Sequence, residues 1–327
     1  MSRYPSVSVI VSYHNEGNLI DRALQSIADQ TYTGPIETVV IDDASEIPFT
    51  LSQSLSQQIR VLRSEENLYA GGARNLAVSH ASGEYLCFLD ADDEYLPERI
   101  ESQVSFLLSH PDVLYVGSPY WIHRGKIWLQ NPRALQEFDP GLLEKSQVLP
   151  DEFRFWVCNS YYCNTGAITL RRSVFERLKG FDASYRWGEE WDLQVRAAQL
   201  GKVGFTSTPS YRYLCRPNSI TSTENPEKHV SAARMHRLWR KTVAGLPPAI
   251  RQNLRSKEQE AWLLAAQFYL EGRHDAKRAF RCVCSSLSCG ASVWGMRSFL
   301  RTALHSCRDF LLGQNKPPLG NERGKPD

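Results

Sequence analysis

The sequence lacks any hydrophobic run long enough to cross a membrane. A transmembrane helix needs about 18 or more consecutive apolar residues, and no stretch of this chain approaches that length. The first apolar run, Val7–Ser12, is too short for a signal peptide, and a polar loop follows it where a cleavage region would lie. We therefore expect a cytoplasmic protein with neither a leader nor an anchoring helix.

Paired cysteines are lacking as well. The chain has eight cysteines among 327 residues, and none belongs to a C-x-x-C pair of the kind that binds zinc. A chain of this size buries enough core to fold without disulfides. We interpret the cysteines as reduced thiols, which agrees with a cytosolic location.

Charge is present in an ordinary amount, but its sign is unevenly distributed. Residues 1–223 contain 20 Lys and Arg against 27 Asp and Glu, whereas residues 224–327 contain 18 against 9. The sign changes at a stretch rich in Pro, Asn, Ser and Thr, residues 216–228. We therefore predict an α/β domain at 1–223, a helical extension at 224–315 and a disordered tail at 316–327.

Strand and helix patterns alternate through the first two-thirds of the chain. Short β-branched runs are typical of strands buried on both faces, and segments with helical spacing separate them. The alternation predicts a doubly wound, mostly parallel sheet flanked by helices, with ligands bound beyond the carboxyl ends of the strands. We expect strands at 7–12, 36–43, 58–64, 84–90, 113–118, 126–131, 166–172, 202–207 and 210–216, with 126–131 antiparallel. We expect helices at 18–29, 70–81, 97–110, 173–179, 189–201, 229–243, 256–271, 275–288 and 293–312, and residues 132–160 show no clear period.

One buried strand ends in a cluster of carboxylates. The stretch YLCFLDADDE, residues 85–94, is apolar until Asp90 and then carries acids at positions 92, 93 and 94. Asp90 and Asp92 are two positions apart, a spacing that puts both on one side of an extended segment. Oxygen ligands with open positions suit Mg²⁺ or Mn²⁺ shared with a substrate's phosphates. The alternative is a solvated acidic loop that caps the following helix.

The surroundings of these acids resemble the inverting glycosyltransferases of family two, which have a GT-A fold. The likeness lies in four segments in the same order: VSVIVSYHNEGNLIDRALQSIADQTY, ETVVIDDAS, NLYAGGARNLAVSHASGEYLCFLDADDEYLPE and GFDASYRWGEEWDLQVRAAQLG. They span residues 7 to about 201. The resemblance implies transfer of a sugar, with inversion, from a nucleoside diphosphate donor to a hydroxyl of a carbohydrate or lipid-linked acceptor. It also implies Mg²⁺ or Mn²⁺ as cofactor and a role in polysaccharide, glycolipid or cell-surface glycan synthesis.

The resemblance assigns roles to the donor side of the site. Asp90 and Asp92 would hold the metal, with Asp92 counted among the catalytic residues and Asp93 close to the sugar or the metal shell. Residues expected to bind the nucleotide are Tyr13, Asn15, Glu16, Asp43, Arg74 and Asn75. Asp42 reads as a turn residue, and the glycines at 71 and 72 would let the backbone approach the ligand.

The acceptor side departs from the family pattern at two positions. The family's general base is the second residue of an acidic pair, and here Glu190 occupies that place where Asp is usual, with Glu189 the minor candidate. Arg216 stands where a histidine ligand is usual, and arginine can clamp a phosphate but cannot bind a metal; a plain surface arginine is the alternative. Residues 153–168 are expected to form the acceptor wall, and Trp187 and Trp191 fit either sugar stacking or core packing.

Two other functions and two other partners remain open at this point. A sugar-phosphate nucleotidyltransferase has a similar core, but the loop YHNEG is not the Gly-rich, basic loop that its chemistry needs. A non-catalytic nucleotide-sugar binder is the alternative from another class. The basic helical pattern at 293–312 would suit peripheral contact with the inner face of the membrane, and packing on the catalytic domain or in a homodimer is the alternative, which we favour. We expect no nucleic-acid partner.

Overall fold

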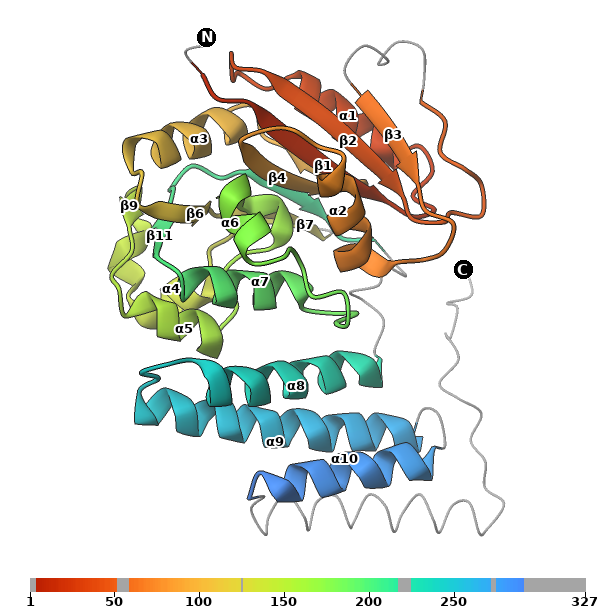
Figure 1. Cartoon of the computed structure of the whole chain (residues 1–327), viewed down its shortest axis with the longest axis vertical. Coiled ribbons are helices and arrows are strands. Elements are labelled where there is room, and N and C mark those ends of the chain that lie inside the picture. The colour runs from red at the N-terminus through yellow and green to blue at the C-terminus, as the bar shows by residue number, and fades with distance from the viewer. Residues whose placement is uncertain (1–3, 52–58, 125, 217–224, 272–274, 291–327) are drawn as a thin grey trace. The chain divides into compact units, whose positions relative to one another are not determined.

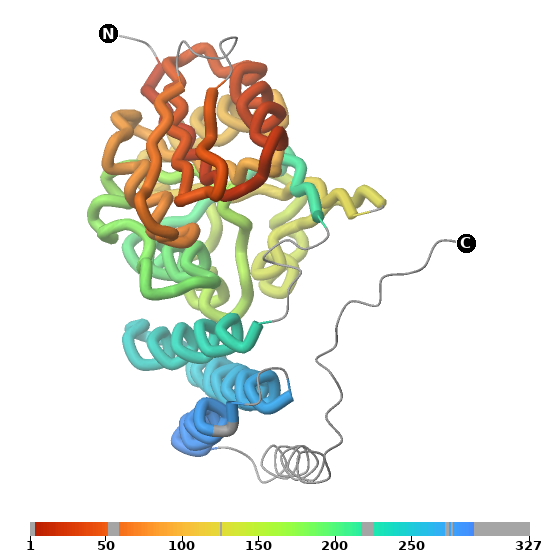
Figure 2. The backbone as a smooth tube through the Cα atoms, turned by 90° about the vertical axis from the view of Figure 1, so that its right-hand side faces the viewer, coloured from red at the N-terminus to blue at the C-terminus, as the bar shows by residue number. Residues whose placement is uncertain are grey.

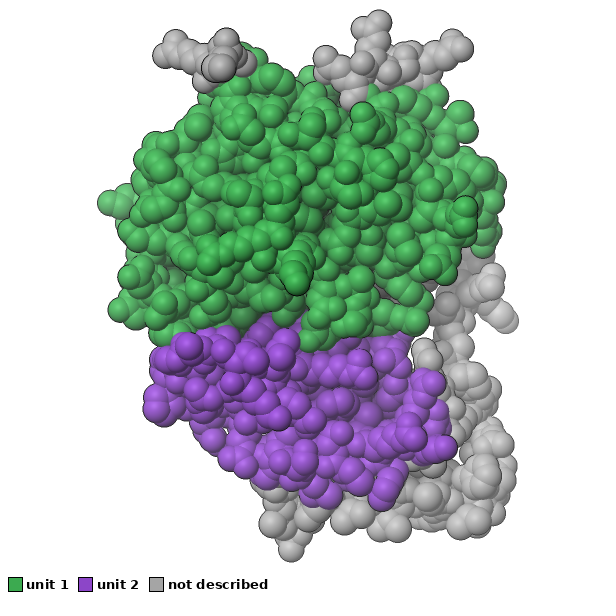
Figure 3. Space-filling view, viewed as in Figure 1, with its two compact units in different colours: residues 1–222 green, residues 223–327 purple. Residues whose placement is uncertain are grey.

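The computed structural model describes residues 4–51, 59–124, 126–216, 225–271 and 275–290. The chain divides into two compact units, residues 1–222 and residues 223–327, which are coloured separately in Figure 3. The expected helix at 293–312 and the expected tail at 316–327 lie outside the described residues. Of the helices that are described, none is long and apolar enough to cross a membrane.

The first half of unit 1 is a parallel sheet with helices on both faces. Its strands are β1 (Val7–Tyr13), β2 (Ile36–Asp42), β3 (Ile59–Arg63) and β4 (Tyr85–Asp90), in the spatial order β3-β2-β1-β4. Its helices are α1 (Leu19–Ala28) and α2 (Tyr69–Ser79). The chain moves from β1 to β2 in one direction and from β3 past β1 to β4 in the other, so right-handed crossovers put α1 and α2 on opposite faces (Figure 1).

Apolar side chains explain why these segments form the centre of the sheet. Val7, Val9, Ile10 and Val11 of β1 are fully buried, and β4 is buried along its length until Asp90. Helix α1 buries one stripe, made of Ile20, Ala23, Leu24 and Ile27. The α/β architecture predicted from these patterns is therefore confirmed.

The second half of unit 1 extends the same sheet with strands of mixed direction. The eight-stranded sheet continues from β4 in the order β10-β6-β11-β9. These strands are β10 (Thr169–Arg171), β6 (Val113–Gly117), β11 (Lys202–Phe205) and β9 (Gln147–Val148). Strand β10 runs antiparallel to both of its neighbours, and β9 runs antiparallel to β11. The helices are α3 (Arg99–Ser109), α6 (Arg172–Arg177) and α7 (Glu189–Ala198).

The segment without a clear sequence period folds into short pieces. Residues 132–160 contain α4 (Arg133–Phe138), η2 (Pro140–Leu143), β9 and α5 (Phe153–Asn159), and η3 (Thr165–Ala167) follows. None is long enough to show a helical or strand repeat, and aromatic packing holds them in place. Phe153 of α5 packs edge-on against Phe138 and Tyr162, with ring centroids 5.7 and 5.2 Å apart.

A second sheet carries a hairpin that extends from unit 1. It has four strands in the order β5-β12-β7-β8, namely β5 (Glu94–Tyr95), β12 (Tyr211–Leu214), β7 (Tyr120–Arg124) and β8 (Lys126–Gln130). Strand β8 is antiparallel to β7, as predicted, whereas β7 itself was not predicted. In Figure 2 the β7–β8 hairpin, in yellow, points away from the body of the unit.

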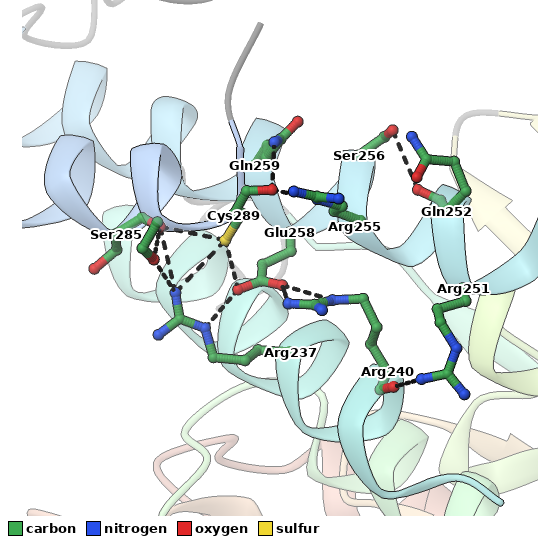
Figure 4. Close-up of polar contacts among 11 residues, drawn as sticks. Arg237, Arg240, Arg251, Gln252, Arg255, Ser256, Glu258, Gln259, Ser285 and Cys289 are labelled. Carbon is green, nitrogen blue, oxygen red and sulfur yellow. Dashed lines mark hydrogen bonds and ion pairs between the residues drawn. The ribbon is translucent and has the colours of Figure 1, made fainter. Parts of the chain in front are cut away.

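Unit 2 is built from helices α8 (Pro226–Thr242), α9 (Pro248–Glu271) and α10 (Ala276–Ser288). A buried carboxylate ties all three together. Glu258 of α9 is fully buried and accepts hydrogen bonds from Arg237 and Arg240 of α8 and, at 2.8 Å, from the thiol of Cys289 just after α10 (Figure 4). Both guanidiniums remain partly exposed to solvent. The cluster therefore supplies hydrogen bonds and opposite charge to the buried carboxylate without burying a second full charge.

We predict that Glu258→Gln destabilises unit 2. Removing one partner of a buried ion pair typically costs about 3–5 kcal/mol, and the lower end applies because both arginines can hydrate. The free energy of unfolding, followed by tryptophan fluorescence in urea, should fall by about 3 kcal/mol. Glu260→Gln, two residues away and exposed, is the matched control and should change it by less than about 0.5 kcal/mol. Equal effects of the two substitutions would contradict a structural role for the cluster.

Candidate active site

The site lies where the strand order reverses, at the carboxyl ends of β1 and β4. Ser12 and Asp90 are directly paired across these two strands. The Ser12 hydroxyl donates a 2.9 Å hydrogen bond to Oδ1 of Asp90. In open α/β sheets ligands bind at this kind of switch point, so the fold itself puts Asp90 at a ligand site.

A buried arginine joins the first acid of the D-x-D stretch to helix α7. Arg74 of α2 donates to Oδ1 of Asp90 at 2.6 Å and to Oε1 of Glu189 at 2.8 Å. Its side chain is 5% exposed and that of Glu189 is 6% exposed, whereas the Asp90 side chain is 43% exposed. Arg74 therefore orients Asp90 from the protein interior, while the rest of the Asp90 carboxylate remains exposed to solvent.

The remaining acids of the stretch are held by the segment after β12. Arg216 donates to Oδ2 of Asp92 through Nε and Nη2, at 2.8 and 2.6 Å. Asp93 is 2% exposed and accepts a hydrogen bond from the backbone N–H of Leu214. Burial, followed by the charges of its neighbours Asp92 and Asp90, raises the pKa of Asp93 well above its ordinary value. Burial also raises the pKa of Asp92, and Arg216 opposes the shift.

The two acids at the end of β2 have different roles. Asp42 accepts hydrogen bonds from the backbone N–H groups of Ser45 and Phe49 and from Arg63, so it fixes the turn, as predicted. Asp43 uses Oδ1 to accept hydrogen bonds from the Ser64 hydroxyl and the Leu68 N–H. Its role in nucleotide binding remains a prediction.

The loop after β1 is folded back on this turn. His14 donates from Nδ1 to the carbonyl oxygen of Asp43, at 2.7 Å, and Asn15 takes a positive φ of 65°. The Asn15 side chain accepts from the N–H of Glu46, and the Glu16 carboxylate accepts from the N–H of His14. Burial raises the pKa of Glu16, with the charge of Asp92 contributing, so this loop and the D-x-D stretch share one electrostatic environment. Tyr13 is buried against Phe49.

Asn75 and the glycines of α2 serve packing in this structure. The Asn75 amide donates to the carbonyl of Phe181 and accepts from its N–H, at 2.8 and 2.9 Å, so both ends are used. A Cβ on Gly71 would lie 3.1 Å from the side chain of Glu189. The glycine thus admits α7 next to α2, whereas the sequence suggested that it admits a ligand.

Helix α7 presents one acid to the site and buries its neighbours. Glu190 is partly buried and accepts a 2.9 Å hydrogen bond from the Tyr161 hydroxyl. Asp192 is bound by Arg196 one turn later. The indole N–H of Trp191 donates to the carbonyl of Val157, so this tryptophan packs structurally. Glu190 is the one acid of EEWD, residues 189–192, that neither is buried nor forms an ion pair among the described residues.

Two contacting residues carried little signal in the sequence. Tyr161 lies in the segment expected to line the acceptor side, and burial, then the charge of Glu190, raises its pKa well above the ordinary value. It therefore stays protonated and donates to Glu190. Ser12 is a polar residue near the end of the otherwise apolar strand β1. Its contact with Asp90 depends on the pairing of β1 with β4, which the sequence does not show.

The carboxylates alone are too few to form a complete ligand set for a divalent cation. Within the described ranges, no three His, Cys, Asp or Glu residues are arranged to hold a metal. Mg²⁺ sites commonly use one or two carboxylates, with phosphates and waters completing the shell. The hydrogen bonds engage Oδ1 of Asp90 and Oδ2 of Asp92, so each carboxylate keeps its second oxygen for another ligand. The donor set therefore fits a cation that arrives with a diphosphate.

A doubly wound sheet with acids at its switch point agrees with the GT-A fold that the sequence predicts. The family model "Glycosyl transferase family 2" matches residues 8–179, and the chain belongs to that family. The resemblance seen in the sequence is thus confirmed, together with the fold.

Relatives and solved structures agree with this assignment. The amylovoran biosynthesis glycosyltransferase AmsB of Erwinia amylovora is 31% identical over 60% of this chain and 65% of its own. The Escherichia coli UDP-Glc:alpha-D-GlcNAc-diphosphoundecaprenol beta-1,3-glucosyltransferase WfgD is 33% identical over 32% of this chain and 42% of its own. A crystal structure of S. aureus TarS in complex with UDP-GlcNAc superimposes with a TM-score of 0.64 over 95% of this chain and 93% of that chain, at 17% identity.

We predict a pH-dependent stability that originates at Glu189. Burial, with the neighbouring charge of Glu190, raises its pKa to about 8, while Arg74 opposes the shift. The folded state then holds a proton that the unfolded state has released, so the free energy of unfolding falls as the pH rises from about 5 to about 8, by at most about 1.4 kcal/mol per pH unit. Glu189→Gln resembles the neutral acid and should abolish this part of the fall. If the free energy of unfolding, measured in urea, changed with pH in the same way for both proteins, Glu189 would be ionised throughout this pH range.

Proposed function

We propose that the protein transfers a sugar, with inversion, from a nucleoside diphosphate donor to an acceptor hydroxyl in the synthesis of a polysaccharide or another cell-surface glycan. The observation that carries the proposal is the convergence of Asp90, Asp92 and Glu190 on one end of the sheet, with Arg74 tying Asp90 to the helix of Glu190. Membership of glycosyl transferase family 2 supports the reaction class. The TarS complexes with UDP-GlcNAc and UDP support the donor class.

Glu190 is the proposed general base. An acceptor hydroxyl is a weak nucleophile while it keeps its proton, and a positioned carboxylate can remove that proton during attack. In the proposed step the hydroxyl oxygen bonds to the anomeric carbon, the bond from that carbon to the diphosphate oxygen breaks, and the diphosphate leaves with the electron pair. The proton passes to Glu190. Glu189 is a poor candidate because its side chain is buried and its Oε1 already accepts a hydrogen bond from Arg74.

Tyr161 orients the proposed base. Its hydroxyl donates to Oε1 of Glu190, and its ring lies edge-on to Trp191 with centroids 5.8 Å apart. A donor to one carboxylate oxygen leaves the other free to accept the proton of the acceptor. Residues 153–168, which contain Tyr161, are accordingly proposed as part of the acceptor wall.

Asp90 and Asp92 would hold Mg²⁺ or Mn²⁺ together with the donor. When bound, the cation would offset the charge that develops on the leaving diphosphate. Arg216 adds a fixed positive charge beside Asp92, and we propose that it binds a phosphate oxygen of the donor as well. Tyr13, Asn15, Glu16 and Asp43 are proposed to line the nucleoside part of the site, next to this phosphate end.

Two alternatives make different chemical predictions. A sugar-phosphate nucleotidyltransferase would release pyrophosphate, whereas a binder would release nothing. Names of two relatives favour transfer, since AmsB is called an amylovoran biosynthesis glycosyltransferase and WfgD acts on a diphosphoundecaprenol-linked sugar. We therefore propose a polysaccharide-building role with a carbohydrate or lipid-linked acceptor.

We predict that Asp92→Asn abolishes transfer while leaving the fold intact. The substitution removes a proposed metal ligand and the partner of Arg216, and the side chain lies at a strand end outside the core. Nucleoside diphosphate release should fall by at least about 100-fold, and EDTA should inhibit the wild-type protein. The urea midpoint should change little. Full release in EDTA, or in Asp90→Asn combined with Asp92→Asn, would rule out the metal role.

We predict that Glu190→Gln reduces turnover by at least about 10²-fold, the usual contribution of general-base catalysis. Gln keeps the size and still accepts from Tyr161, so the affinity for the donor, measured by calorimetry, should be unchanged. Glu190→Asp should retain partial activity. Wild-type turnover in Glu190→Gln together with loss in Glu189→Gln would move the base to Glu189, and activity in both variants would place it elsewhere.

A further inference from the structure

The β7–β8 hairpin presents a surface that the proposed reaction does not use. Three consecutive residues of β8 are exposed, Ile127 at 60%, Trp128 at 40% and Leu129 at 39%. Because neighbouring side chains on a strand point to opposite faces, apolar groups project from both sides of this edge strand. Large exposed apolar patches on soluble domains usually mark interaction sites.

The hairpin also carries two unpaired cations next to each other. Arg124 and Lys126 are directly opposite in the β7–β8 register, on the same face as Ile122 and Trp128. Like charges in directly opposed positions destabilise a strand pair. Neither side chain forms an ion pair with any carboxylate that the structure describes, and residues 119–131 contain no Asp or Glu. An external anion would relieve this repulsion.

We propose that this hairpin docks on the surface of a membrane that contains anionic lipids. Lipid phosphates would pair with Arg124 and Lys126, while Ile127, Trp128 and Leu129 would enter the boundary between head groups and acyl chains. Tryptophan with flanking basic residues is typical of such interfacial contacts. The proposal concerns a different part of the chain from the basic helical pattern at 293–312.

Two other occupants fit the hairpin less well. A second copy could pair along the free edge of β8, but it would bring the same two cations and no carboxylate. A water-soluble polyanion would pair with the cations but leave the apolar residues in water. Only a surface that is both anionic and apolar satisfies both halves of the hairpin.

The backbone connects this surface to the site. Strand β7 pairs with β12, matching Ile122 with Tyr213 and Leu214 with His123. The N–H of Leu214 bonds to Asp93, and Arg216, two residues later, clamps Asp92. A docked hairpin would therefore hold the acid cluster near the lipid surface. This consequence rests on the proposed function, because it matters only for a lipid-linked acceptor. The docking of the hairpin itself does not depend on the proposed function.

The test is sedimentation of the full chain with vesicles of phosphatidylcholine that contain about 30% phosphatidylglycerol. Arg124→Gln with Lys126→Gln should weaken binding by about thirtyfold, since each basic residue near such a surface contributes about five- to sixfold. Ile127→Ser with Trp128→Ser should weaken it at least about tenfold. The control Lys145→Gln with Arg177→Gln removes the same charge from exposed positions of unit 1 and should bind like the wild type.

Stability and activity separate the possible outcomes. Arg124→Gln with Lys126→Gln should not lower the urea midpoint, because it removes a repulsion. Undiminished vesicle binding by both hairpin variants, or an equal loss in the control, would overturn the proposal. So would a wild-type dimer that Trp128→Ser dissociates without any vesicle binding. The sedimentation assay contains no sugar donor or acceptor, so a failure of docking can be distinguished from a failure of sugar transfer.

Discussion

The bond of Arg74 to two acidic side chains is the interaction on which the site depends. A buried guanidinium is costly unless its charge and its donors are matched, and here Asp90 of β4 accepts one hydrogen bond while Glu189 of α7 accepts another. The same contact fixes the distance between the proposed metal ligands and the helix that carries the proposed base. Gly71 and Asn75, on the same helix as Arg74, close the remaining gap, one by lacking a side chain beside Glu189 and the other by bonding to Phe181. Helix α2 is thus a structural link between the two halves of the site.

The crowding of acids at the end of β4 follows from the position of that strand. Its residues are buried until Asp90, so the chain reaches solvent only at the switch point, where the charges then accumulate. The protein partly neutralises them with Arg74 and Arg216, and burial raises the pKa of Asp93, which favours the neutral form of that acid. The acids at this end of the sheet still outnumber the two arginines, so the site favours a cationic ligand over a bare diphosphate. This asymmetry is the physical reason for expecting donor and cation to bind together.

Much of this arrangement was predictable from the sequence, because buried strands and amphipathic helices carry strong periodic signals. The ends of β1, β2 and β4 followed from that pattern to within one residue, and the family likeness drew attention to Glu190. The hydrogen bonds of Arg74 and Asn75 within the protein did not follow, because a motif does not show which neighbours a side chain contacts, and the part of both residues in nucleotide binding remains a prediction. Strand β7 was missed because its apolar start at Tyr120 passes directly into His123 and Arg124 and shows no strand pattern. The pieces between residues 132 and 160 were missed because they are too short to show a period. Tyr161 and Ser12 contact the acids through tertiary packing and strand register, which no local pattern encodes.

Arg216 shows how a departure from a family pattern can preserve its chemistry. Where a neutral histidine would add a metal ligand, the arginine adds a permanent charge and occupies one oxygen of Asp92. A cation bound there would therefore have fewer protein ligands, but the phosphates would meet a positive side chain that is already oriented. Lys could not substitute well, because the guanidinium engages Asp92 through two nitrogens and still has further donors for a phosphate. In the proposed reaction this position would therefore support the charge of the leaving diphosphate, whereas a histidine there would contribute a metal ligand.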